Sequence, residues 1–109
     1  MATAYKVLGQ QAPSATTDTN VYTVPAATEA VISTIIIANR AVTAGSFRIA
    51  VRPNGESIAN KHYIAYDVPI AANDSTTLTL GITMDATDVI TAYCSSANMS
   101  VNVFGSEIS

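Results

Sequence analysis

Hydrophobic and polar residues alternate with a period of two along most of this chain. In segment 47–52, Phe47, Ile49 and Val51 are separated by arginine and alanine residues, which is the pattern of a half-buried strand. Segments 77–82 and 99–104 alternate in the same way. The run 31–38 is almost continuously apolar and predicts a central strand covered on both faces. Weaker strand patterns occupy residues 5–8, 21–24, 62–68 and 89–94.

Turn-forming residues separate these runs, and Asn54-Gly55 is the strongest turn signal among them. Residues 57–61 predict at most one helical turn. The sequence therefore predicts an all-β fold with less than about a tenth of its residues in helices. We expect a single small antiparallel β-sandwich, of jelly-roll or immunoglobulin-like type, with roughly seven to nine strands.

The length of 109 residues predicts one domain over residues 1–109. Residues 9–20 form its one low-complexity polar stretch. Such a stretch buries too little apolar area to order itself. We expect either a flexible polar loop or a docking arm that orders on a neighbouring subunit.

Only 12% of the residues are charged, and Ala, Thr and Val are abundant. A surface with so little charge, together with the run Ile35–Ile37, predicts a homo-oligomer, with a trimer slightly ahead of a dimer. The net charge of −3 and five scattered cations argue against binding to nucleic acid. No apolar stretch is long enough to predict a membrane span. Residues 1–6 do not resemble a signal peptide, so cytoplasmic synthesis is expected.

Few residues offer catalytic chemistry. His62 is the only histidine, and its place beside Lys61 at the start of a strand predicts a solvated edge residue. Cys94, the only cysteine, excludes an internal disulfide. It shares a strand face with Ile90 and Ala92, so it is expected in the core rather than as a nucleophile. We therefore expect no enzymatic activity, no cofactor and no required metal.

Three aspartates lie in predicted turns. Asp85 and Asp88 bracket one turn and could share a calcium ion, but hydrogen bonds to the turn backbone are the expected role. Asp74 is expected to do the same. Tyr63 and Tyr66 are expected on opposite faces of their strand, which gives a weak signal for sugar binding.

Arg48 and Arg52 share one strand face. They could bind a carboxylate or phosphate, although a solvated outer face is the simpler interpretation. We predict docking through residues 9–20 and this arginine face, with the arm contributing more to affinity.

The order of strand and turn segments resembles that of small virion structural proteins of tailed bacteriophages, particularly cyanobacterial phages. The likeness extends over nearly the whole chain and is carried by strand and turn signatures. They are 8–9, 21–28, 31–40, 47–53, 63–70, 78–82, 88–90 and 104–108. The resemblance implies a compact β-sandwich on the virion, and it assigns no functional residues.

Two positions on the particle agree with that resemblance. A capsid decoration (cement) protein would bind the major capsid protein and stabilise the particle, whereas a tail, baseplate or fibre component would bind tail proteins and contact the host. A carbohydrate-binding module is a third hypothesis from another class, and a small hydrolase is a distant fourth.

Overall fold

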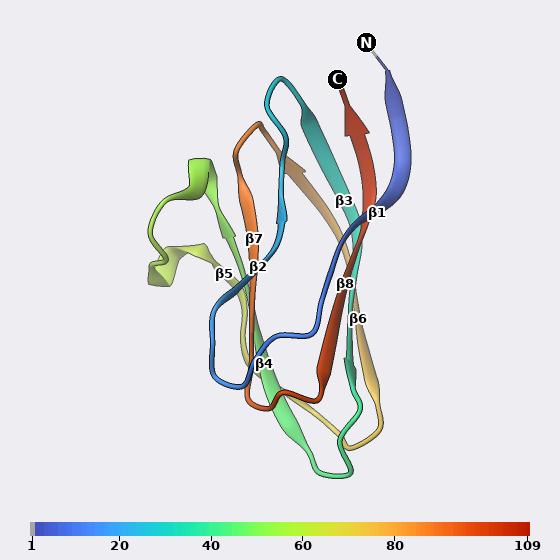
Figure 1. Ribbon diagram of the computed structural model, residues 1–109, viewed down its shortest axis with the longest axis vertical. Helices are drawn as coiled ribbons and strands as arrows, with labels where there is room; N and C mark the ends of the chain where they lie inside the picture. The colour runs from blue at the N-terminus through green and yellow to red at the C-terminus, as the bar shows by residue number, and fades with distance from the viewer. Residues whose placement is uncertain (1) are drawn as a thin grey trace.

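The computed structural model describes residues 2–109, and nearly all of its regular structure is β: 62% of residues are in strands and 6% in helical turns. Eight strands follow one another along the chain (Figure 1). Their bounds are β1 Thr3–Gln11, β2 Thr19–Thr23, β3 Glu29–Asn39, β4 Gly45–Arg52, β5 Tyr63–Ile70, β6 Ser75–Met84, β7 Val89–Cys94 and β8 Met99–Ile108. Two 3₁₀ turns, η1 Pro53–Gly55 and η2 Asn60–His62, lie between β4 and β5.

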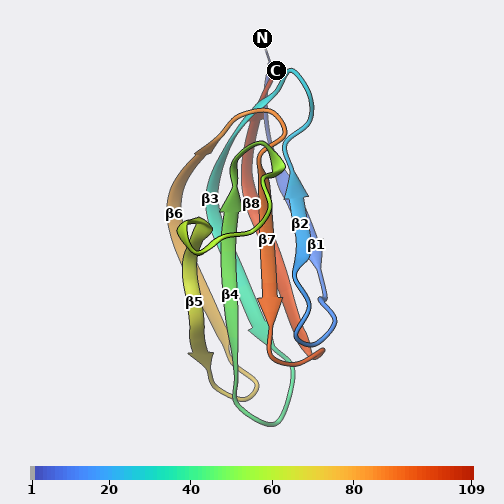
Figure 2. The ribbon, with the colours of Figure 1, turned by 90° about the vertical axis from the view of Figure 1, so that its left-hand side faces the viewer.

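The strands form two four-stranded antiparallel sheets packed face to face. The first sheet has the order β1-β8-β3-β6 and the second the order β2-β7-β4-β5, which faces the viewer in Figure 2. The pairs β1–β8, β2–β7, β3–β6 and β4–β5 are those of one long hairpin folded over on itself. This arrangement is a jelly roll, so the all-β sandwich is confirmed and the immunoglobulin-like alternative is not the one adopted.

The core lies between the two sheets and is built by the inward positions of the alternating strands. Phe47 and Ile49 of β4 are completely buried, as are Val101 and Val103 of β8. The remaining apolar positions of the alternating segments 47–52 and 77–82 are partly buried and pack against the core; they are Val51, Leu78, Leu80 and Ile82. The period-two pattern therefore identified the inner faces of three strands correctly.

The prediction for β3 was partly wrong. β3 is a central strand, between β8 and β6, and Ile35 and Ile37 are completely buried. Ile36, however, is only partly buried. A two-layer sandwich covers one face of each sheet, so a continuous apolar run does not require cover on both faces.

Residues 9–20 are more ordered than predicted. Residues 9–11 belong to β1 and residues 19–20 to β2, which leaves residues 12–18 as the connection. Pro13 is completely buried, and the Thr16 N–H donates to the Cys94 carbonyl at 2.8 Å. Pro13 and the hydrogen bond of Thr16 attach the connection to its own domain, so the expectation that the segment does not pack there was wrong at these positions, and its role as a docking arm stays a prediction.

Candidate functional site

A guanidinium lies between two aromatic rings on the outward face of the second sheet. The Cζ atom of Arg48 in β4 is 4.2 Å from the ring centroid of Tyr66 in β5 and 4.3 Å from that of Tyr93 in β7. Tyr63 meets Tyr66 edge to face, with centroids 4.9 Å apart and ring planes at 84°. We call these four residues the tyrosine–arginine ladder. It crosses three neighbouring strands and combines apolar rings with a fixed positive charge.

The ladder is held in place by Asp67. The Arg48 Nε donates to Oδ1 of Asp67 at 2.6 Å, and Nη2 lies 3.4 Å from Oδ2. This bond raises the pKa of Arg48 above its ordinary value, so the group is charged throughout the working pH range. Two bonds and two ring contacts fix one geometry of a side chain that would otherwise be flexible.

An irregularity in β5 brings Tyr63 and Tyr66 to the same side. The β4 partners of Tyr63, Ala65 and Val68 are Ala50, Ile49 and Phe47, so β5 carries extra residues relative to β4. Asp67 has a φ of 50°, in the left-handed region. The extra residue between Tyr63 and Ala65 breaks the period of two between the two tyrosines. The prediction that the two tyrosines lie on opposite faces was therefore wrong.

Arg52 lies on the same outward face but forms a separate cluster. Its Nε donates to Oγ1 of Thr91 at 2.9 Å, and Nη2 donates to Oδ1 of Asn20 at 2.8 Å. Nη1 donates to the carbonyl of Glu56 at 2.8 Å. The two arginines predicted for docking thus share a face, and each already has partners within its own chain.

Next to the ladder is an open hollow of about 500 Å³ lined by Asn60, Tyr63 and Tyr66. Tyr66 is 55% exposed although its ring already contacts Arg48 and Tyr63. An exposed ring beside an amide and an ion pair can hold a ligand that has both apolar and hydroxyl surfaces.

His62 is not the solvated residue that the sequence predicted, because only 5% of it is exposed. Its Nδ1 accepts from the Ala59 N–H at 3.0 Å, which leaves the proton on Nε2 in the neutral ring. Nε2 lies 3.3 Å from Oε1 of Glu56. The 3₁₀ turn η2 folds the ring inward. The histidine thereby contacts Ala59 and Glu56 of the connection between β4 and β5.

Cys94 is completely buried, as predicted. Burial raises the pKa of its thiol to about 11, so the thiolate needed for nucleophilic attack is scarce at neutral pH.

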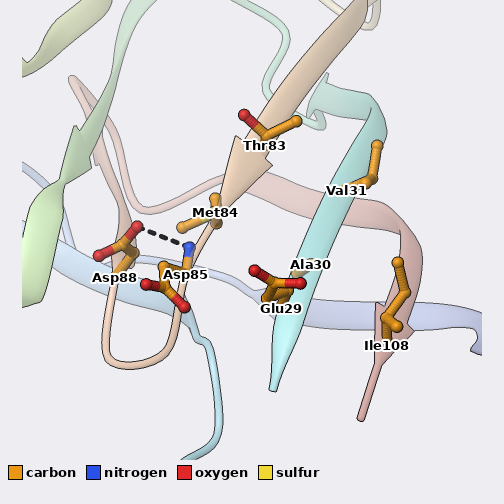
Figure 3. Close-up of a pocket in the computed structure, with 8 residues that line it drawn as sticks. All are labelled: Glu29, Ala30, Val31, Thr83, Met84, Asp85, Asp88 and Ile108. Carbon is orange, nitrogen blue, oxygen red and sulfur yellow. Dashed lines mark hydrogen bonds between the residues drawn. The ribbon is translucent and has the colours of Figure 1, made fainter. Parts of the chain in front are cut away.

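The aspartates cap turns, as expected. Asp88 accepts from the N–H groups of Asp85 and Asn54, both at 2.8 Å, and the first of these bonds is drawn in Figure 3. Asp74 accepts from the Ser75 N–H at 2.8 Å. A second hollow, drawn in Figure 3, is lined by Glu29 together with Asp85 and Asp88. Within residues 2–109, no group of three or more His, Cys, Asp or Glu side chains is placed to hold a metal ion.

Comparisons with protein-family models, curated proteins and solved structures give no match for this chain. In the described part of the chain, no helix is long and apolar enough to cross a membrane.

Sequence reasoning found Arg48 and Arg52 and singled out Tyr63 and Tyr66, but it missed Tyr93 and the contacts that join these side chains. Tyr93 could have been found, because it alternates with the inward-facing Ala92 and Cys94 of its strand. Its contact with Arg48 depends on the pairing of β4 with β7. The position of Tyr66 beside Tyr63 depends on the extra residue between Tyr63 and Ala65, and neither feature has a local sequence signal.

Proposed function

We propose that this protein is a non-enzymatic structural protein of a virus particle, with capsid decoration as its favoured role. The observation that carries the binding role is the tyrosine–arginine ladder on the outward face of the second sheet. The assignment to a virion rests on the sequence resemblance to small phage structural proteins. The major capsid protein is the favoured partner and tail proteins are the second.

The composition of the ladder suits a protein interface. Tyrosine and arginine are enriched among the residues that contribute most to binding energy, usually near the centre of a contact. Arg48 is already fixed by Asp67 and two rings, so little further side-chain entropy is lost when a partner binds. Because both arginines bond within their own chain, a partner would contact tyrosine edges and the rim of the guanidinium.

The fold is compatible with this role. Jelly rolls occur in viral capsid domains and in lectins, and one fold supports many functions.

Particle composition is the first test. Mass spectrometry of virions that encode this chain should find it among the abundant proteins if it decorates the capsid. A few copies for each particle would favour the tail, baseplate or fibre alternative. Its absence from purified virions would overturn the proposal.

The second test measures the contribution of the ladder. Particles lacking the protein are incubated with wild type, Tyr66→Ala or Arg48→Ala, and the retained protein is quantified at several salt concentrations. We expect each variant to be retained about tenfold less well than wild type. Thr77→Ala, at an exposed position of β6 in the other sheet, is the matched control. Equal retention of all four proteins would exclude the ladder as the docking site.

Carbohydrate binding is the second candidate function, and the exposed Tyr66 beside the Asn60 hollow favours it. A pyranose packs its C–H face on an aromatic ring while its hydroxyls bond planar polar groups. Titration with a panel of oligosaccharides, followed by NMR, should shift the Tyr63 and Tyr66 ring signals. Unchanged ring signals at millimolar sugar would exclude this alternative.

A further inference from the structure

The first half of β1 is an open sheet edge. β1 pairs with β8 alone, and its first residues lie at the margin of the molecule in Figure 1. Ala2 and Ser109 exchange both backbone hydrogen bonds, at 2.6 and 2.9 Å. In an antiparallel ladder this alternation directs the N–H and C=O groups of Thr3, Tyr5 and Val7 away from β8. Three donors and three acceptors are thus available along this edge.

The side chains of this edge are also unusually apolar for a strand that is exposed to solvent. Tyr5 is 85% exposed and Val7 is 48% exposed. Edge strands are commonly protected by proline, by an outward-pointing lysine or by a bulge. No proline occurs in residues 3–7, and the bulge comes only after Val7.

Lys6 does not block the edge, because it is engaged elsewhere. Its Nζ lies 2.6 Å from Oε1 of Glu107 in its own chain. By alternation its side chain lies on the opposite face of the strand from Tyr5 and Val7. A strand added at this edge would therefore meet no free charge on the face that carries the tyrosine.

We infer that β1 pairs antiparallel with β1 of a second copy of this chain, about a two-fold axis at Tyr5. The pairing places Tyr5 opposite Tyr5 of the second copy and Thr3 opposite its Val7. The free N–H groups of each copy then donate to the free carbonyl groups of the other. Lys6 then lies opposite Ala4 of the second copy, and like charges do not face each other. The two first sheets join into one continuous sheet.

A second copy fits this edge because the edge is self-complementary under a two-fold operation. Antiparallel pairing about Tyr5 closes after two copies, so it gives a dimer rather than the trimer that composition favoured. The bulge after Val7 limits pairing to a short segment. The interface is therefore small, and the dimer should be weak and concentration-dependent. The inference does not depend on a virion location.

Sedimentation velocity over roughly micromolar to millimolar concentrations tests the inference. Wild type should shift from monomer to dimer. Tyr5→Pro removes an N–H that faces away from β8, so it should abolish the dimer while leaving the β1–β8 ladder intact. Tyr5→Thr keeps that N–H and should retain part of the association. Val42→Ser, which removes another strongly exposed apolar side chain, should dimerise like wild type.

Hydrogen exchange on the wild-type protein provides a second measurement that does not depend on any variant folding. The amides of Thr3, Tyr5 and Val7 should become at least tenfold more protected as concentration rises. Those of Ala4 and Lys6, which face β8, should be protected throughout. A monomer at all concentrations would overturn the inference, as would a dimer in which the Thr3, Tyr5 and Val7 amides exchange at unchanged rates.

Discussion

The phenol of Tyr22 in β2 donates a hydrogen bond of 2.6 Å to Oε2 of Glu107 in β8, and so joins the two sheets. Lys6 of β1 binds the other oxygen of the same carboxylate at 2.6 Å. These two partners, Lys6 first and Tyr22 second, lower the pKa of Glu107. Burial, together with Glu107, raises the pKa of Tyr22 well above its ordinary value.

This linkage predicts a loss of stability in acid. Because the pKa of Glu107 is lower in the folded state, its contribution is complete above the unfolded pKa of about 4.3 and is lost as pH falls through the folded value. Glu107→Gln should cost about 1 kcal/mol or less at pH 7, since Lys6 is half exposed. The difference from wild type should shrink as pH falls below about 4.

Urea unfolding of wild type and Glu107→Gln at several pH values measures this difference. Tyr22→Phe removes only the hydroxyl donor and should cost about 1 kcal/mol. A difference between wild type and Glu107→Gln that is constant from neutral to acid pH would contradict the assigned role of the carboxylate.

Cys94 should resist thiol reagents in the native protein. The side chain is completely buried and its pKa is raised to about 11, so at pH 8 both access and thiolate are limiting. Incubation with an aromatic disulfide reagent should give slow labelling that accelerates strongly in denaturant. Rapid labelling without denaturant would mean that β7 opens readily or that the thiol is accessible.

Gly105 and Gly81 should respond differently to replacement by alanine. A Cβ atom on Gly105 would clash with the Val31 carbonyl oxygen, and backbone cannot move aside cheaply. Gly105→Ala should therefore lower the free energy of unfolding by about 1–3 kcal/mol. A Cβ atom on Gly81 meets nothing within 4 Å, so Gly81→Ala should be neutral or raise it by about 0.5 kcal/mol. Thermal or urea unfolding of both variants measures these changes. Equal changes in the free energy of unfolding would contradict the close approach of β8 to β3.

The turn between β2 and β3 offers a stabilising change. Ala27 has a φ of 57° and is exposed, and a left-handed conformation is unfavourable for alanine. Ala27→Gly should raise the free energy of unfolding by about 0.5 kcal/mol, after the greater chain entropy of glycine is subtracted. Ala26→Gly, at the exposed neighbouring position without a positive φ, is the control and should lower it. The reverse order of the two variants would contradict the turn geometry.

Local patterns in the sequence were sufficient to predict the strands. Each of the eight strand segments expected from alternation or apolar runs overlaps an observed strand, and segment 89–94 coincides with β7. Asn54 and Gly55 both have positive φ, as the turn signal predicted. These features depend on the conformational preferences of neighbouring residues and on one buried face for each strand, and both are readable along the chain.

Tertiary structure decided which strand positions meet and therefore what the surface displays. The extra residue between Tyr63 and Ala65 brings Tyr66 to the side of Tyr63, and the pairing of β4 with β7 puts Tyr93 beside Arg48. The turn η2 buries His62, and the pairing of β1 with β8 leaves Tyr5 at an open edge. The sequence alone determined the jelly roll's strands and its core, because alternation is a local property. The tyrosine–arginine ladder and the open edge arise from register, which is set by contacts between residues far apart in the chain.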